Sequence, residues 1–319
     1  MISQLVSKIK VTLQLRRKAE AGNKATDKVW LYNFWNVKAE EMWVTRFLAH
    51  RGLMKTGKRL SFYSVFGDKK QLDYDKRDLK IFITGENVHY HDFEKSYADN
   101  LLSSKEIDLS LGFDFLDDAR YVRFPLWLRT AFRPDLTEKE IKERVKQLRY
   151  PEIGDRMKFA AMIARYDWGN TRSQICKALE NVGDICCPSK VLHNDETLKT
   201  VYQDDKQSYL RQFCFNICPE NSNWPGYVTE KVFDSISAGC IPIYWGSDNK
   251  PELDVLNQDA LILWDFDADN AKNIAKIEDL WNNKDLLSEM LHRPRLVDGA
   301  EDVILAYFSR LEKAFVDLL

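Results

Sequence analysis

The sequence predicts an α/β protein built from two doubly wound domains that face each other. Apolar runs typical of buried strands alternate with helical patterns twice along the chain, first from Val29 and again from Lys158. The strand candidates are continuously apolar, which is typical of parallel strands covered by helices on both faces. A chain of 319 residues is also long enough for about two domains.

In the first half, the predicted helix covers residues 39–51, where Met42 and Phe47 have helical spacing. Residues 135–150 form a second, highly charged helix. That helix, together with the turn that follows it at residues 151–155, is the best candidate for the connection between the domains. Strands are expected at residues 29–35, 60–67, 79–87, 107–113 and 121–128.

In the second half, a helix over residues 173–181 is expected to be capped by Asn170 or Thr171. A helix over residues 229–238 is expected to end at Gly239, because glycine readily adopts the left-handed conformation that closes a helix. Strands are expected at residues 158–166, 240–246 and 260–264, and residues 209–218 are expected to contain another. Further helices are expected from residue 269 and over the amphipathic tail at 300–319, which is expected to pack back on the first domain.

The overall charge excludes some classes of partner. With 47 Lys and Arg against 49 Asp and Glu, the net charge is −2, which gives no indication of nucleic-acid binding. Residues 1–28 are locally basic, with seven Lys or Arg and two Asp or Glu, a net of +5. This leader lacks the apolar core and cleavage site of a signal peptide. Leu5, Val6, Ile9 and Leu13 can share one helix face, so a solvated leader and a peripheral membrane anchor both stay open.

Cysteine spacing does not favour a metal or disulfide framework. All six cysteines lie in the second half, in mostly apolar surroundings. Cys214 and Cys218 would share one face of a strand and are interpreted as small core residues. Cys186 and Cys187 precede His193, but a zinc site would need a fourth ligand and better spacing.

The segment DFDADN, residues 265–270, contains an Asp-x-Asp pattern that could hold a divalent metal and a diphosphate. It also resembles the start of a calcium loop. The calcium interpretation fails because Asn270 and Lys276 stand where that loop needs Gly and Glu. We interpret the segment as a polar loop in which Asp267 or Asp269 caps the next helix.

Ligands of open α/β sheets bind beyond the carboxyl ends of the strands, which directs attention to the loop after FCFNIC. A helix begins there close to Thr229, and a helix N-terminus favours an anion. Lys231 in its first turn and Tyr227 just before it could hold a phosphate, while Glu230 would suit the paired hydroxyls of a ribose. The alternative is that Glu230 only complements the helix dipole and Lys231 is solvated.

Two further strand ends carry candidate residues. In ITGEN, residues 83–87, a carboxylate beside a glycine is a reasonable general base, or else a turn residue or helix cap. Arg172 stands at the start of a helix, where its donors could reach a diphosphate, or else it is a surface arginine. The sequence contains neither GxGxxG nor GxxxxGK[ST], which argues against a dinucleotide dehydrogenase or a P-loop enzyme.

Longer blocks of the sequence resemble a known family. The run FCFNICPENSNWPGYVTEKVFDSISAGCIPIYWGSD is similar to the donor-binding signature of the α-1,3-fucosyltransferases, glycosyltransferase family 10. FITGEN and then GFDFLDDARYVRFPLWL resemble a second block of the same family, in the same order. The resemblance is greatest to bacterial members and covers the chain from about residue 29 to about residue 250.

The resemblance implies a GT-B fold, in which two Rossmann-like doubly wound domains face each other across a cleft. Residues 29–154 would bind the acceptor and residues 155–299 the donor GDP-β-L-fucose. Residues 1–28 would be the basic leader, and residues 300–319 the helix that packs back. The protein would be cytoplasmic, with peripheral contact on the inner membrane face through the leader.

The resemblance also implies roles for single residues. Glu86 would be the general base of an inverting transfer to O3 of N-acetylglucosamine in an N-acetyllactosamine-type glycan. No cofactor or metal would be required, and a divalent metal would at most stimulate. Arg172 and Lys231 would bind the diphosphate, Glu230 the ribose and Asn221 and Tyr227 other parts of the donor. Trp35, His89 and His91 are the expected acceptor residues.

Three alternatives stay open. A GT-B transferase for another sugar nucleotide would prefer UDP or CMP to GDP. A non-catalytic protein would bind a nucleotide or glycan without turnover. An Asp-x-Asp enzyme would lose all activity to a chelator.

Overall fold

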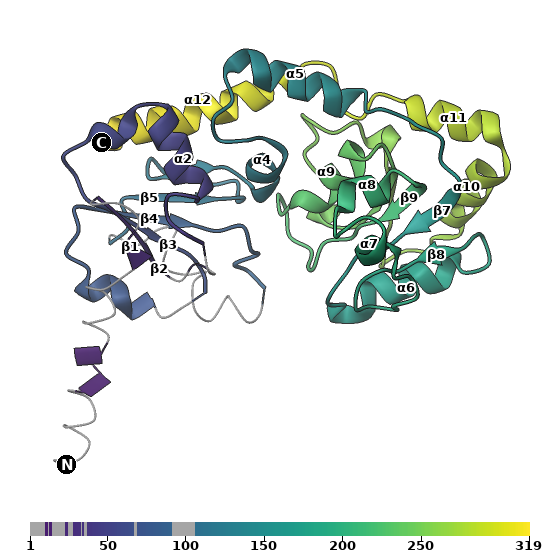
Figure 1. Cartoon of the computed structure of the whole chain (residues 1–319), viewed down its shortest axis with the longest axis horizontal. Coiled ribbons are helices and arrows are strands. Elements are labelled where there is room, and N and C mark those ends of the chain that lie inside the picture. The colour runs from purple at the N-terminus through teal and green to yellow at the C-terminus, as the bar shows by residue number, and fades with distance from the viewer. Residues whose placement is uncertain are drawn as a thin grey trace. The chain divides into compact units, whose positions relative to one another are not determined.

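The computed structural model describes residues 10–11, 13–14, 23–24, 28–32, 34, 37–66, 69–90 and 106–319 of the chain. The chain divides into two compact units, each with a sheet of its own (Figure 1). The first unit comprises residues 1–129, 133–135 and 307–319, and the second residues 130–132 and 136–306. The predicted α/β class is confirmed, because both sheets are parallel apart from one edge strand.

The sheet of the first unit has its strands in chain order. β2 to β6 run parallel to one another, and β1 pairs with β2 in the antiparallel direction. Because neighbouring parallel strands end at the same edge, the turns that follow β4 and β5 lie close together. The strands are β1 (Asn23–Lys24), β2 (Val29–Tyr32), β3 (Leu60–Tyr63), β4 (Leu79–Ile83), β5 (Leu109–Gly112) and β6 (Tyr121–Arg123).

An aromatic cluster attaches two helices to this sheet. Phe308 of α12 (Ala300–Leu318) contacts Trp43 and Phe47 of α2 (Trp43–His50), with ring centroids 6.1 and 6.4 Å apart. Phe124, just after β6, contacts the same Phe308 ring edge-on at 5.6 Å. All but Trp43 are nearly inaccessible to solvent, so the final turns of α12 belong to the core of the first unit.

The prediction of one strand over residues 121–128 is wrong at its end. β6 stops at Arg123, and α4 (Leu126–Ala131) follows. Proline is favoured at the start of a helix, because the N–H group that it lacks would have no partner there in any case. Pro125 stands at that position, and its carbonyl accepts a hydrogen bond from Leu128 N at 3.1 Å. The apolar run continues because Trp127 and Leu128 are buried on the helix instead of the strand.

The sheet of the second unit reverses its strand order. Its order is β11-β10-β9-β7-β8, so the chain moves outward from β7 to β8 and then returns to the other side of β7 with β9. In open α/β sheets such a reversal opens a crevice at the carboxyl ends of the two strands concerned. The strands are β7 (Lys158–Ala161), β8 (Ile185–Cys186), β9 (Phe213–Ile217), β10 (Ile241–Tyr244) and β11 (Ile262–Leu263).

The helices of the second unit begin with α5 (Glu138–Arg149), where Thr137 and Glu140 form a capping box. This helix is grouped with the second unit, whereas the sequence placed the domain boundary after it, at residue 154. The other helices are α6 (Thr171–Leu179), α7 (Thr197–Thr200), α8 (Lys206–Leu210), α9 (Glu230–Ser237), α10 (Ala271–Asn282) and α11 (Lys284–His292), with 3-10 turns η4 (Trp168–Asn170), η5 (Ser247–Asn249) and η6 (Gln258–Ala260).

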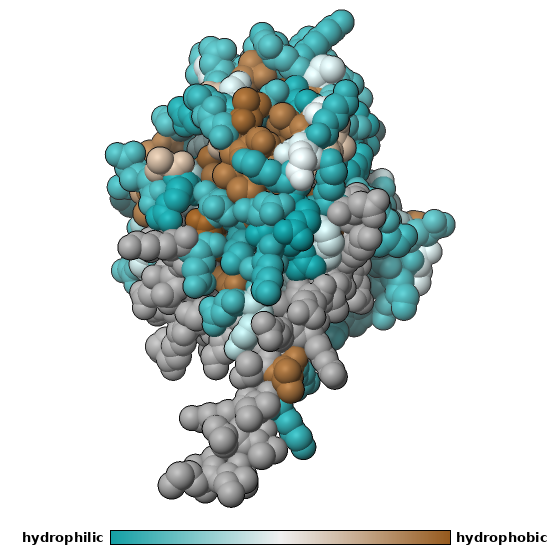
Figure 2. Space-filling model, turned by 90° about the vertical axis from the view of Figure 1, so that its left-hand side faces the viewer, coloured by the Kyte–Doolittle hydropathy of each residue, from teal (hydrophilic) through white to brown (hydrophobic). Residues whose placement is uncertain are grey.

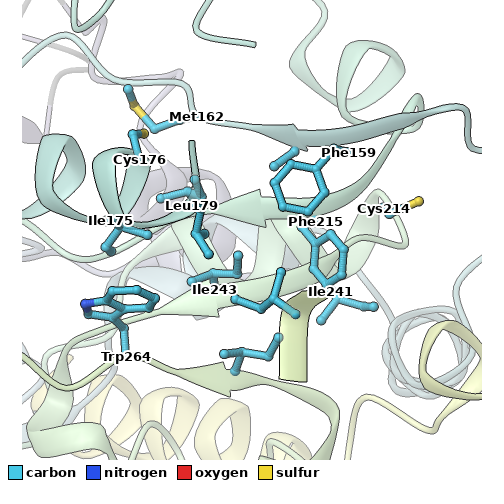
Figure 3. Close-up of a cluster of buried hydrophobic side chains, with 14 of the residues drawn as sticks. Phe159, Met162, Ile175, Cys176, Leu179, Cys214, Phe215, Ile241, Ile243 and Trp264 are labelled. Carbon is cyan, nitrogen blue, oxygen red and sulfur yellow. The ribbon is translucent and has the colours of Figure 1, made fainter. Parts of the chain in front are cut away.

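The core of the second unit lies against its central strands (Figure 3). Phe159 of β7 and Phe215 of β9 contact each other with ring centroids 5.3 Å apart. Ile241 and Ile243 continue the cluster from β10. Burial of such side chains contributes about 1.5–3 kcal/mol each. Cys214 and Cys218 are buried, as expected for core residues, and all six cysteines are free.

Little of the predicted basic leader can be compared with the structure. Val11 and Leu13 are about half exposed, at 52% and 49%, whereas Leu5, Val6 and Ile9 lie outside the described residues.

Figure 2 shows a face of the molecule on which apolar side chains gather in one area among hydrophilic ones. Within the described ranges, no helix is both long enough and apolar enough to cross a bilayer.

The expected end of α9 at Gly239 is confirmed, and it yields a stability prediction. Gly239 has a φ of 78°, and a Cβ there would meet the Glu152 carbonyl oxygen at 2.8 Å and Ile153 at 3.1 Å. We expect Gly239→Ala to lower the free energy of unfolding by about 2–4 kcal/mol, because backbone strain and overpacking add. Urea unfolding measures this.

Gly299→Ala is the matched control, because Gly299 has a φ of 83° and nothing within 4 Å of an added Cβ. It lies in the same unit and should lose only the strain contribution, about 1 kcal/mol. Equal losses in the two variants would show that the crowding around Gly239 is unimportant.

Candidate functional site

The candidate residues of the second unit gather at the carboxyl ends of β7 and β9, the two strands between which the sheet order reverses. Arg172 follows β7 at the start of α6, and Glu230 and Lys231 open α9 after the loop that leaves β9. These three side chains line one cavity of about 80 Å³. Arg172 also reaches Asn221, so the structure brings four of the five predicted donor residues of this unit together.

The start of α9 leaves its first amide groups available to an anion. The side chain of the N-cap residue Thr229 accepts no hydrogen bond from a backbone amide of the first turn, and the first amides of any α-helix lack partners within the helix. Instead, Thr229 Oγ1 donates to Glu220 Oε2 at 2.7 Å and accepts from Lys231 Nζ at 2.9 Å. The first-turn residues Glu230 and Lys231 line the cavity, and the positive end of a helix dipole favours an anion near these residues.

Lys231 is a partly buried cation with carboxylates on either side. Its Nζ lies 3.0 Å from Glu220 Oε2 and 3.8 Å from Glu230 Oε1, and its side chain is 21% exposed. Burial by itself would lower the pKa of Lys231, but the two carboxylates outweigh burial and raise it. The ammonium group is therefore charged at neutral pH.

Arg172 is almost fully buried, with 4% of its surface exposed. Its Nη2 donates to the Pro219 carbonyl at 3.0 Å and to Asn221 Oδ1 at 2.9 Å, which ties α6 to the loop after β9. Its Nη1 is buried and makes no hydrogen bond within the described parts of the chain. Burial lowers the pKa of Arg172, against the opposing effect of Asp167 and Glu220. The surface-arginine interpretation is wrong.

The prediction that Asn170 or Thr171 caps α6 is also wrong. Asn170 is left-handed, with a φ of 58°, and caps nothing with its side chain. Asp167 does so instead, because its carboxylate accepts from Arg172 N at 2.8 Å and from Ser173 N at 2.9 Å. The 3-10 turn η4 separates Asp167 from the helix in sequence and folds it back over the helix start.

The remaining donor candidates differ in exposure. The side chain of Glu230 is 35% exposed and can reach a ligand. Tyr227 is 2% exposed, its amide donates to the Trp224 carbonyl at 3.0 Å, and it does not line the 80 Å³ cavity. Larger cavities, of about 1030 Å³ beside α5 and about 620 Å³ beside α6 and β8, are lined by none of the predicted residues.

In the first unit, Glu86 lies in the turn after β4. Its amide donates to Thr84 Oγ1 at 3.0 Å, and Arg129 Nη2 donates to the Thr84 carbonyl at 3.1 Å. Gly85 permits this approach, because a Cβ there would lie 2.8 Å from Arg129 Nη2. Burial lowers the pKa of Arg129 to about 10, and the Glu86 carboxylate opposes that shift. Arg129 thus holds the turn, a role that the sequence did not reveal.

His89 is paired with a carboxylate from the neighbouring strand end. His89 Nε2 lies 2.6 Å from Asp114 Oδ1, and Asp114 follows β5 as His89 follows β4. The edge of the His89 ring also contacts Phe113 at 6.1 Å between centroids. Asp114 is a residue that sequence reasoning missed. Trp35 and His91, the other expected acceptor residues, lie outside the described residues.

The DFDADN segment is a polar loop, as interpreted from the sequence. Asp269 Oδ1 accepts a hydrogen bond from Ala271 N at 2.9 Å at the start of α10. The Asn270 side-chain amide accepts a hydrogen bond from Asp265 N and donates one to the Asp265 carbonyl, so both bonds close the loop onto the Asp265 backbone. Over the ranges that the structure describes, no group of three or more His, Cys, Asp or Glu side chains is placed to hold a metal ion.

The Glu220 carboxylate accepts four hydrogen bonds at the site, and no role for Glu220 was predicted from the sequence. It is 0% exposed, and Thr229, Lys231 and Tyr244 donate to its carboxylate. The available signal was its place three residues after a buried strand, next to Asn221. Sequence alone does not distinguish such a buried acid from the exposed Glu230.

Comparison with known proteins shows which proteins this chain is similar to in sequence. A relative from Helicobacter pylori, alpha-(1,3)-fucosyltransferase FucT, is 29% identical over 214 residues, which cover 59% of this chain and 41% of that protein. Alpha-(1,3)-fucosyltransferase B of Drosophila melanogaster is 32% identical over 89 residues, 28% of this chain and 20% of that protein. The chain thus spans less than half the length of these relatives.

Solved structures confirm the predicted GT-B type fold. The crystal structure of an alpha1,3-fucosyltransferase matches with a TM-score of 0.57 and 21% identity, over 93% of this chain and 96% of that one. An alpha1,3-fucosyltransferase solved with GDP-fucose matches with a TM-score of 0.55 and 21% identity over the same shares.

Two family models match the sequence directly. The model for the alpha-(1,3)-fucosyltransferase FucT N-terminal domain matches residues 29–129. The model for the glycosyltransferase family 10 (fucosyltransferase) C-terminal part matches residues 155–291. Together they take in most of the chain, and the chain therefore belongs to glycosyltransferase family 10, the fucosyltransferase family.

Proposed function

We propose that this protein is an inverting α-1,3-fucosyltransferase. It transfers L-fucose from GDP-β-L-fucose to O3 of N-acetylglucosamine in an N-acetyllactosamine-type glycan. Membership of family 10 and the fucosyltransferase names of its relatives support the reaction class. The solved alpha1,3-fucosyltransferase with GDP-fucose supports the choice of donor.

The observation that carries this proposal is a pair of buried or partly buried cations beside a helix N-terminus. Lys231 and Arg172 line one cavity at the β7–β9 strand reversal, next to the first turn of α9. A diphosphate needs charge-assisted donors of this kind and rarely needs an apolar pocket. The partly exposed Glu230 carboxylate would accept the ribose hydroxyls, and Asn221 and Tyr227 would contact other parts of the donor.

The same cations would act in catalysis. As the bond between fucose and the diphosphate breaks, negative charge grows on GDP and the sugar becomes oxocarbenium-like. Positive groups already fixed at that place stabilise the charge without reorganising. The side chains of Lys231 and Arg172 and the helix dipole therefore supply what a metal ion would otherwise supply, and we propose that a divalent metal at most stimulates.

The base would come from the first unit. Glu86 would take the proton from the acceptor hydroxyl as its oxygen attacks the anomeric carbon from the face opposite GDP. A positioned base of this kind contributes about 10²–10⁴-fold. The Thr84 and Arg129 contacts would keep the Glu86 turn in place. His89, oriented by Asp114, would hydrogen-bond the acceptor sugar.

Location and membrane contact remain predictions. We propose a cytoplasmic protein that touches the inner membrane face through its basic residues 1–28. The half exposure of Val11 and Leu13 is compatible with such contact.

The direct test of the function is product formation from GDP-fucose. We expect transfer to N-acetyllactosamine-type acceptors, with an α-1,3 linkage in the product by glycosidase digestion and NMR. In thermal-shift experiments GDP should raise the melting temperature, whereas UDP and CMP should not. A larger shift with UDP or CMP would favour another sugar nucleotide, and nucleotide binding without turnover would favour a non-catalytic protein.

Glu86→Gln tests the base. The variant keeps the size of the side chain but cannot accept the proton, so kcat should fall by about 10²–10⁴-fold. GDP affinity should stay within about twofold, because the donor site lies in the other unit. Glu40→Gln, an exposed glutamate of the same unit, is the control and should keep full turnover. Full turnover in Glu86→Gln would refute the assignment.

Lys231→Ala tests the diphosphate site. Losing one charge-assisted hydrogen bond should weaken GDP binding about 10- to 100-fold by titration calorimetry. Lys177→Ala on α6, whose side chain is 76% exposed, is the control and should bind GDP normally. The assignment fails if both variants bind GDP as the unmodified protein does.

A further inference from the structure

Four hydrogen bonds converge on the Glu220 carboxylate, and the proposed function assigns no role to this residue. Its Oε1 accepts from Thr229 N at 2.8 Å and from Tyr244 OH at 3.2 Å. Its Oε2 accepts from Thr229 Oγ1 at 2.7 Å and from Lys231 Nζ at 3.0 Å. A carboxylate with no exposed surface is stable in its charged form only when donors of this kind surround it.

The backbone around Glu220 fixes the place of this carboxylate. Glu220 N donates to the Trp245 carbonyl at 2.8 Å, which continues the pairing of β9 with β10. Gly246 leaves room for the side chain, because a Cβ there would lie 2.7 Å from Glu220 Cγ and 2.9 Å from Tyr244 OH. The carboxylate therefore has one position, set by two strands and the start of α9.

That position determines the geometry of Lys231. An ammonium group has three donors, and two of those of Lys231 are directed at Glu220 Oε2 and Thr229 Oγ1. Among the residues that the structure describes, the third donor makes no hydrogen bond, so it can serve a ligand in the cavity that Lys231 lines. Without Glu220, the long and flexible lysine side chain would lose this orientation and the ligand would have to order it again.

Glu220 also determines the charge of Lys231. Burial lowers the pKa of Lys231, and the neighbouring Arg172 lowers it further. Glu220 and Glu230 both raise the pKa of Lys231, and Glu220 raises it more strongly. The other titratable groups around the ammonium are Lys206 and Asp234, which line the same cavity, and Cys218 and Tyr244, which lie beside Glu220.

We propose that Glu220 is a positioning residue of the donor site, which orients the Lys231 ammonium group and supplies its counter-charge, so that Lys231 can bind the diphosphate of the sugar nucleotide. The identity of that ligand rests on the proposed function. The effect on Lys231 rests on the geometry alone. Glu220 itself touches no substrate.

Glu220→Gln separates positioning from mere structural support. We expect the pKa of Lys231, followed by NMR of labelled lysine side chains in the ligand-free protein, to fall in the variant, because burial is no longer opposed. The ratio of GDP dissociation constants, variant over unmodified protein, should then be higher at pH 9 than at pH 7. The protonation of GDP itself affects both dissociation constants equally, so its effect cancels in this ratio.

Tyr244→Phe is the matched control. It removes one donor to Glu220 and keeps the charge next to Lys231, so its ratio should stay constant over the same pH range. If Glu220→Gln does not fold, Glu220→Asp replaces it, because its shorter carboxylate moves away from Lys231 and the Lys231 pKa should again fall.

An unchanged pKa of Lys231, or an equal loss of GDP affinity at pH 7 and pH 9, would overturn the proposal. A lowered Lys231 pKa in a protein that does not bind GDP would refute the proposed donor and leave the role of Glu220 toward Lys231 standing.

Discussion

The buried ion pair between Glu220 and Lys231 is the interaction on which the second unit's site depends. It joins the end of β9 to the first turn of α9, and Tyr244 extends it to β10. A buried carboxylate that loses its partner is strongly destabilising, so the strands, the loop and the helix must all adopt one arrangement to satisfy it. The same arrangement places the first-turn residues Glu230 and Lys231 of α9 at one cavity.

A second pair follows the same logic on the neighbouring strand. Asp167 caps α6 and lies 4.0 Å from Arg172 Nη1, so this cation also has a counter-charge before any ligand arrives. Two cations close together would otherwise repel each other in a site of low dielectric constant. The carboxylates thus allow Arg172 and Lys231 to be held near each other at the strand reversal, where an anionic ligand can use both.

The sequence predicted most of this fold because strand and helix signals are local. The buried strands and the end of α9 at Gly239 follow from apolar runs and glycine chemistry. The pairing of His89 with Asp114 could not be predicted in this way, because it arises between two strands that become neighbours only in the folded sheet. Likewise, the η4 turn gives the cap of α6 to Asp167, whereas sequence distance favours Asn170.

A crystal structure of the protein with GDP tests the central claim most directly. The account predicts that a diphosphate oxygen lies about 3 Å from Lys231 Nζ while Lys231 stays hydrogen-bonded to Glu220. The phosphates would sit over the first turn of α9, with Glu230 at the ribose. GDP bound elsewhere on the chain, or a Lys231 that leaves Glu220 and points away from the phosphates, would contradict the account.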